Sequence, residues 1–240
     1  MMTTSKMYYS LRHDLFHKNM ASQQTRYLPE FTSFVSRYKT APVMVAGSLQ
    51  ERFKNIWFWS DQHFGHANII KYSERPFKDA DQMNEMLLLN YNRVVDKDSV
   101  VIWVGDVAFK SADWTNAFLK RFVPAYRILI VGNHDYEKKK GFKQLDFDEV
   151  HSHYQLDNAW ITHYPMNRIP HGVFNIHGHI HTNNTNNPRH FNVSVEQIGY
   201  APKSYAYICA KMANVNMMLD ENDSTYDLSP DNQRHRDNNL

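Results

Sequence analysis

An apolar run that stops at a glycine and continues into three polar residues is the feature that most constrains this chain. Residues 128–131 are Ile, Leu, Ile and Val, which is typical of a strand buried on both faces. Gly132 lets the backbone turn sharply, and Asn133, His134 and Asp135 follow it directly. Open α/β sheets bind ligands at the carboxyl ends of their strands, so we expect a central strand that ends in a functional loop.

Other strand-like segments repeat this design, and each of them ends in a carboxylate or in imidazoles. Residues 56–60 precede Asp61 and His63, residues 100–104 precede Gly105 and Asp106, residues 160–162 precede His163, and residues 173–176 precede Gly178, His179 and His181. Segments that share one design and end in ligand-type side chains predict a site at one edge of a sheet.

Helices are expected between the first strands. Asp79 with Gln82 three residues later has the form of a capping box, and Met83, Met86 and Leu87 supply an apolar face that we assign to the core. Ser111 is expected to cap a second helix that carries three apolar side chains inward, Trp114, Phe118 and Leu119. Strand-helix-strand alternation predicts a largely parallel sheet.

The ordered set of these motifs resembles a known family signature. Asp61-x-His63, Gly105-Asp106, Gly132-Asn133-His134-Asp135, His163 and Gly178-His179-x-His181 resemble the calcineurin-like metallophosphoesterases, over roughly residues 56–195. The resemblance implies an α/β fold, the two-sheet αββα metallophosphoesterase sandwich. We expect residues 1–54 to form a partly helical extension, residues 55–212 the phosphoesterase domain, and residues 213–240 a polar, disordered tail.

The resemblance also implies two divalent metal ions with a bridging carboxylate. Asp106 is assigned to the bridge, Asp61, His63 and His181 to one metal, and Asn133, His163 and His179 to the other. Residues two apart on an extended segment point the same way, which lets Asp61 and His63 reach one ion and lets His179 and His181 serve adjacent ions. Manganese is the first choice, with iron, zinc or nickel as alternatives.

The implied reaction is attack on phosphorus by a hydroxide that bridges the two metals. In the family the histidine that corresponds to His134 protonates the leaving oxygen. Asp135 either orients His134 or caps a following helix. For substrate contacts we consider His66, which alternatively only opens the next helix, and Arg75, which alternatively only forms a turn.

The segment after the second motif bears on the substrate. Protein Ser/Thr phosphatases of the superfamily have an Asp-Arg-Gly turn there, whereas this chain reads Gly105-Asp-Val-Ala-Phe-Lys110. The difference favours a phosphodiesterase that acts on nucleotides or related small molecules. Phosphomonoesterase and nuclease activities are alternatives, and so is a catalytically silent module that keeps the fold as a binding surface.

Composition restricts the location and the partners. A net charge of +2 gives no global basic field, so nucleic acid is not indicated as a partner. A single cysteine, Cys209, is expected in the core on a strand, and it fits a reducing compartment. The sequence has no signal-peptide pattern and no apolar run of spanning length, so we expect a cytoplasmic protein without membrane contact. The pattern does not predict the oligomeric state.

Overall fold

The structure is a computed structural model that describes residues 55–137, 141–142, 144–170 and 172–218. The expected N-terminal extension, Lys138–Lys140 and residues 219–240 of the expected tail lie outside this part of the chain. The helices are α4 (Ala67–Tyr72), α5 (Ala80–Val94), α6 (Ala112–Leu119) and α7 (Tyr205–Met218), with a 3-10 turn, η1 (Asn133–Asp135). Residues 213–218, predicted to begin the disordered tail, therefore continue helix α7.

One sheet has the order β11-β1-β2-β3-β6. Its strands are β1 (Asn55–Trp59), β2 (Ser99–Trp103), β3 (Tyr126–Ile130), β6 (Glu149–His151) and β11 (Lys203–Ser204). The pairs β1–β2, β2–β3 and β3–β6 are parallel and β11 is antiparallel to β1, which confirms the parallel arrangement expected from strand-helix-strand alternation. The expected central strand, β3, lies inside the sheet between β2 and β6, and its residues pack on both faces.

The second sheet has the order β10-β9-β8-β7. Its strands are β7 (His153–Leu156), β8 (Ala159–Thr162), β9 (Phe174–His177) and β10 (His190–Asn192), and a separate small pair is formed by β4 (Tyr136–Glu137) and β5 (Gly141–Phe142). Strands β7 and β8 form an antiparallel hairpin, whereas β6 before them joins the first sheet.

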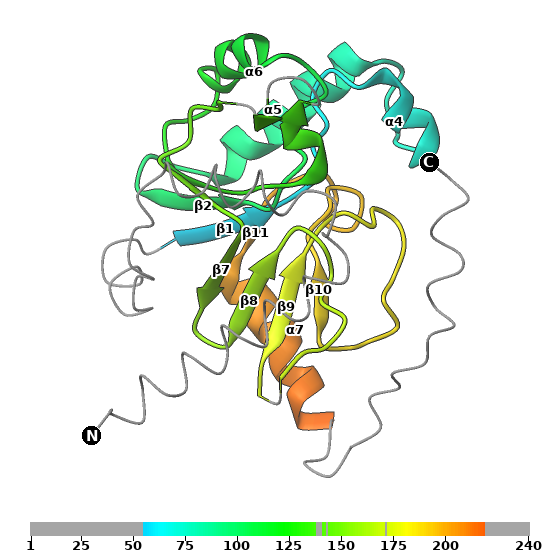
Figure 1. Cartoon of the computed structure of the whole chain (residues 1–240), viewed down its shortest axis with the longest axis vertical. Helices are drawn as coiled ribbons and strands as arrows, with labels where there is room; N and C mark the ends of the chain where they lie inside the picture. Colours follow the sequence, from blue (N-terminus) through cyan, green and yellow to red (C-terminus); the bar gives the residue numbers. More distant parts are fainter. Residues whose placement is uncertain (1–54, 138–140, 143, 171, 219–240) are drawn as a thin grey trace.

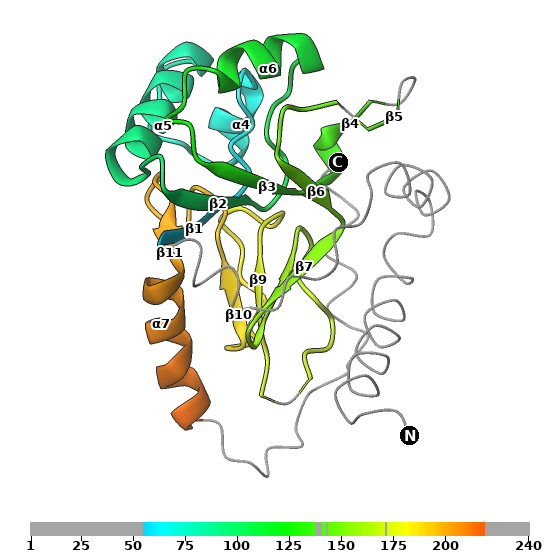
Figure 2. The same cartoon turned by 90° about the vertical axis from the view of Figure 1, so that its left-hand side faces the viewer.

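The two sheets face each other, and helices α4, α5 and α6 cover the other face of the first sheet (Figures 1 and 2). Alternate residues of each strand enter different clusters, as the period of two requires. In β1, Phe58 points between the sheets and Trp59 points toward α5 and α6. Helix α7 contributes Tyr205 and Ile208 to the cluster between the sheets. The α/β sandwich predicted from the resemblance is confirmed.

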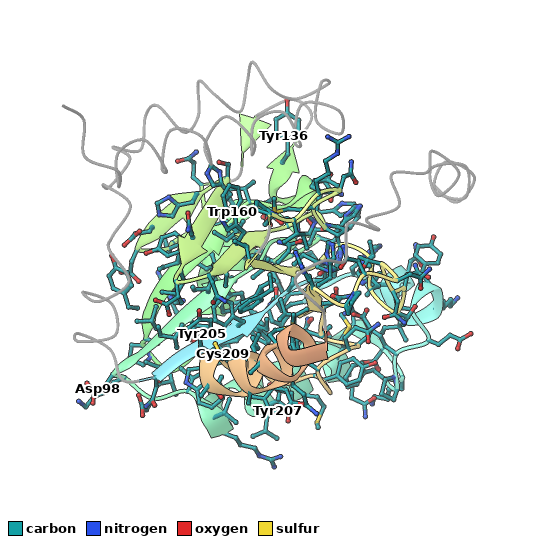
Figure 3. The ribbon with its side chains drawn as sticks, turned by 90° about the horizontal axis from the view of Figure 1, so that it is seen from below. Asp98, Tyr136, Trp160, Tyr205, Tyr207 and Cys209 are labelled. Atoms are coloured by element: carbon teal, nitrogen blue, oxygen red, sulfur yellow. The ribbon has the colours of Figure 1, made fainter. Side chains whose placement is uncertain are left out.

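Both predicted helix caps form, whereas the exposure of Met86 and the location of Cys209 differ from the prediction. Asp79 accepts a hydrogen bond from Gln82 N and Ser111 accepts one from Trp114 N. Met83 is buried, but Met86 is 37% exposed, so the methionine face of α5 is not all core. Cys209 lies on α7 instead of on a strand (Figure 3), because the last segment before the tail folds as a helix.

Candidate metal centre

Six of the predicted metal ligands form two adjoining groups. We call Asp61, His63 and His181 the first group, and Asp106, His163 and His179 the second group. Within each group, one ligand atom from each residue lies within 4.8 Å of the others. The six residues come from loops that follow four strands, β1, β2, β8 and β9. The chain after β10 is joined to the end of β1 by the Ser60–Ser194 bridge.

Asp106 lies between the two groups. Its Oδ2 atom is 3.5 Å from His63 Nε2 and 3.5 Å from His163 Nε2. Its Oδ1 atom accepts a hydrogen bond of 2.8 Å from the backbone N–H of His134. A single carboxylate oxygen at the same distance from one histidine of each group is the geometry that a bridging ligand needs.

Asn133 and His134 both lie close to the two groups, with different neighbours. The Asn133 side-chain oxygen is 3.1 Å from His163 Nε2, so this amide belongs with the second group. The His134 side chain is 37% exposed, and its Nε2 is 4.0 Å from Asp106 Oδ2. His134 therefore borders the groups on their open side and can meet a substrate.

Five of the seven predicted ligands have a left-handed backbone. Their φ values are 59° for Asp61, 51° for His63, 57° for Asp106, 72° for His179 and 49° for His181. The expectation of extended segments was therefore wrong, although His179 and His181 do fall in different groups. Such conformations cost on the order of 1–3 kcal/mol each and concentrate at functional sites.

Two glycines allow the loops to approach one another. A side chain at Gly178 would collide with Ser60 Oγ and Asp61 Oδ2, and one at Gly105 would collide with the His163 ring. Gly105 also has a φ of 92°, which few other residues adopt.

Buried polar atoms without partners mark the place of a cation. Asp61 Oδ1 and both ring nitrogens of His63 are buried and have no hydrogen-bond partner. Asp61 Oδ2 accepts hydrogen bonds of 2.9 Å from His179 N and from Ser194 Oγ, so the other oxygen is left to point at the first group. Buried polar groups are normally paired. These donor atoms therefore fit a metal ion, with the nitrogen and oxygen ligands that zinc, manganese and iron accept.

The electrostatics also favour a cation. Burial alone would raise the pKa of Asp106, but His163, His63 and His134 hold the pKa of its carboxyl well below the usual range. Burial would lower the pKa of His163, but the Asp106 carboxylate raises it to about 10. The negative potential that holds a proton on His163 also attracts a metal ion, which would replace that proton.

Arg75 and Asp135, two of the predicted substrate and acid-base residues, are buried within the protein. Arg75 was considered as a phosphate contact, with a turn as the alternative, but it is 4% exposed and all its donors are engaged within the protein. They bond to Glu196, to the backbone oxygens of Asp61 and Gln62, and to the Met83 sulfur. Arg75 supports the loop of the first group and does not face a substrate.

Asp135 is likewise a buried support, 2% exposed. Its carboxylate accepts hydrogen bonds from three backbone N–H groups, those of Asp106, Val107 and Gly132. The chain continues into strand β4, so the alternative of capping a following helix was wrong. By holding the Asp106 loop against the turn that carries His134, Asp135 sets the relative position of these two residues.

His66 is the last of the predicted contacts, and it lies at the N-cap position of α4 without capping it through its side chain. Its ring centroid is 5.6 Å from that of His63, so it adjoins the first group. Glu196 is a further residue of this region that was not predicted: its Oε1 atom is 3.0 Å from His181 Nδ1 and 2.6 Å from Arg75 Nη2. Nothing in the local sequence predicts this role for Glu196, because Arg75 and His181 are distant from it along the chain.

The fold and the centre together define the class. A two-sheet α/β sandwich with paired His and Asp groups at one end is the architecture of the metallophosphoesterases. A family model described as "Calcineurin-like phosphoesterase" matches residues 54–209. The chain belongs to the calcineurin-like phosphoesterase family, whose members act on small phosphoesters with divalent metals.

Two similar proteins share most of this region. An uncharacterised protein of Methanocaldococcus jannaschii, MJ1445, is 34% identical over 167 residues, which are 63% of this chain and 87% of that protein. The crystal structure of a protein of unknown function from Aquifex aeolicus, AQ665, aligns with a TM-score of 0.50 and 25% identity. The alignment covers 65% of this chain and 98% of that one. In the described part of this chain, no helix has the length and apolarity to cross a membrane.

Proposed function

We propose that this protein is a two-metal phosphoesterase that hydrolyses phosphodiesters, with Asp106 shared between the metals. The observation that carries the proposal is the equal separation of Asp106 Oδ2 from His63 Nε2 and His163 Nε2, 3.5 Å in both cases. Asp61, His63 and His181 would hold one ion and Asn133, His163 and His179 the other. Manganese is our first choice, and iron, zinc and nickel suit the same donors.

Bound at these residues, two divalent ions would supply a water molecule of lowered pKa and neutralise phosphoryl oxygens. The residues of the chain supply the remaining functions. His134 lies 4.0 Å from Asp106 Oδ2 with 37% of its side chain exposed, so its imidazole can reach a leaving oxygen. We assign it the role of general acid, which is worth about 10² to 10⁴ in rate. Asp135 acts as a positioning residue.

The preference for diesters follows from charge. A phosphomonoester carries more negative charge than a diester, and arginine pairs are a common way to bind it. The Arg75 guanidinium, which bonds to the backbone oxygen of Asp61 beside the first group, is fully engaged with protein acceptors. This arrangement favours the less charged diester.

The test compares hydrolysis of bis(p-nitrophenyl) phosphate and p-nitrophenyl phosphate by the manganese-loaded protein. We expect metal-dependent turnover with a higher kcat/KM for the diester. His134→Ala should lower kcat by about 10² to 10⁴ while metal content and circular dichroism stay unchanged.

A matched control is His153→Ala, which removes a partly buried histidine of β7 outside both groups and should leave kcat unchanged. If the folded, metal-loaded wild type turns over neither ester, the proposal is wrong for generic esters. A catalytically silent binding module then becomes the better description.

A further inference from the structure

An exposed aromatic surface borders the open side of the centre. Phe109 is 50% exposed, and its ring stacks on His66 with a centroid distance of 4.1 Å and an interplanar angle of 17°. Tyr72, at the end of α4, is 73% exposed and lies edge-on to His66 at 6.4 Å. We call Phe109, His66 and Tyr72 the aromatic platform.

The platform adjoins the residues assigned to the chemistry. The Phe109 ring centroid is 5.5 Å from that of His134, and the His66 ring centroid is 5.6 Å from that of His63. The ring centroids of His63 and His134 are 5.2 Å apart. A flat group on Phe109 would therefore lie within a few ångströms of the proposed general acid.

Nothing in the local fold requires an aromatic side chain at position 109. The backbone of this loop is already fixed, because Phe109 N donates to Phe64 O at 3.0 Å and Ala108 forms a bridge with Phe64. Phe64 and Ala108 are buried, whereas the Phe109 ring stays half exposed. An exposed apolar ring on an anchored loop beside a functional site is typical of a ligand contact.

The neighbouring Lys110 adds a cationic side chain to this loop. It is exposed, and its aliphatic stem lies against Gly65, where an added side chain would collide with it. An aromatic ring that stacks a base, next to a lysine that attracts phosphate, is the pairing found in proteins that bind nucleotides and single strands.

We propose that the aromatic platform is the subsite for the leaving group of the substrate, and that this leaving group carries a nucleobase that stacks on Phe109. The proposal rests on the proposed function, since it takes His134 as the donor to the leaving oxygen. Phe109 adjoins His134, the proposed proton donor to the leaving oxygen. The nucleobase that stacks on Phe109 therefore belongs to the alcohol that departs, and not to the group that stays on phosphorus. His66 backs Phe109 and fixes the plane of its ring.

The kinetic test uses two phosphodiesters with the same leaving-oxygen chemistry. One is a thymidine dinucleoside monophosphate, in which one thymidine is bonded to phosphorus through its 5′ oxygen and departs on hydrolysis. In the other, a tetrahydrofuran abasic unit replaces this departing thymidine. We expect the wild type to favour the base-bearing diester about tenfold in kcat/KM, within the range known for base–aromatic stacking. Phe109→Ala should reduce this ratio to about 1, and the ratio is the readout because it cancels any common effect of the substitution on His134.

Two further variants sharpen the test. Phe109→Trp keeps a stacking ring and should retain the preference. Tyr207→Ala removes another exposed aromatic, 44% exposed, on the side of α7 opposite Tyr205 and Cys209 (Figure 3), and should change neither rate. A wild type that turns over both diesters equally, or a preference that survives in Phe109→Ala, overturns the proposal.

A binding measurement separates this proposal from the proposed function. Saturation-transfer NMR of the zinc-loaded protein with thymidine 5′-monophosphate should show transfer to the base protons that is lost in Phe109→Ala. Ribose 5-phosphate should not compete for this contact. Absence of transfer in the wild type overturns the base subsite even if aryl diesters are hydrolysed. Transfer without any hydrolysis supports the subsite and rejects the enzyme.

Discussion

The two ligand groups contain the same kinds of side chain, one aspartate and two histidines each, but they are supported differently. In the second group, His163 Nδ1 lies 2.7 Å from the backbone oxygen of Val104. In the first group, His181 Nδ1 lies 3.0 Å from the Glu196 carboxylate, which is paired with Arg75 at 2.6 Å. Main-chain support survives most substitutions, whereas side-chain support can be removed by one. We therefore expect the first group to be the more sensitive of the two.

Substitution of the residue that the groups share should have the largest effect. Asp106→Asn keeps the volume but removes the anion between two sites for dications, so both groups should lose metal. We expect kcat/KM to fall by about 10³ or more, at least the loss seen when a preorganised electrostatic group is removed. The metal-to-protein ratio by mass spectrometry and the kinetics check this. Two bound equivalents with near-normal turnover would contradict a bridging role.

Loss of the buried Arg75–Glu196 ion pair should have the next largest effect, on the stability of the fold. This pair supports the first group only. Arg75→Met removes the guanidinium from the buried Glu196 carboxylate and leaves His181 as its remaining charged partner. We expect a cost of about 3 kcal/mol of unfolding free energy, the lower end of the range for breaking a buried ion pair. Urea unfolding measures this. Arg121→Met is the matched control, because the Arg121–Glu85 pair has the same 2.6 Å separation with side chains 48% and 56% exposed. Its loss should cost less than about 1 kcal/mol. Equal costs for the two variants would show that burial of the pair does not matter.

A milder change tests the difference between the groups directly. Glu196→Gln keeps a hydrogen-bonding partner for His181 but removes the charge, and outer partners of metal-bound histidines are typically worth 10- to 100-fold in metal affinity. We expect one equivalent of metal to weaken and the other to be unaffected, as measured by competition with a chelator. Glu149→Gln is the control, since Glu149 contacts His151 at 2.7 Å outside both groups. Equal weakening of both equivalents would remove the distinction between them.

The smallest expected effect concerns stability away from the site. The hydrogen bond from His151 lowers the pKa of Glu149 from its usual value, burial opposes this, and the Tyr126 hydroxyl adds to the lowering. A depressed carboxyl pKa stabilises the fold above the unfolded-state pKa of about 4.3, and that stability is lost as the pH falls through the folded-state value. Glu149→Gln should therefore cost up to about 1 kcal/mol near pH 7 and progressively less toward pH 3. Thermal unfolding at several pH values checks the trend, which a pH-independent difference would contradict.

Local pattern in the sequence determined the strands, the helix caps and the candidate ligands. Apolar runs that end at polar residues marked β1, β2 and β3, because a strand buried on both faces needs continuous apolar residues and its ligands lie where it ends. Asp79 and Ser111 marked the helix starts, because capping needs an acceptor within three residues of a free N–H. These signals depend only on residues that are neighbours in the chain, so they can be recognised in a single sequence.

Tertiary structure alone decided how the ligands are aimed and supported. The left-handed backbone at Asp61 and His63 is fixed by the contacts of their loop, although aspartate and histidine adopt this conformation more readily than most residues. Arg75 and Glu196 are 121 positions apart, and only the packing of two sheets makes them partners. The stacking of Phe109 on His66 likewise needs two loops to meet. A sequence pattern records what each segment prefers by itself, whereas support and strain are properties of segments brought into contact.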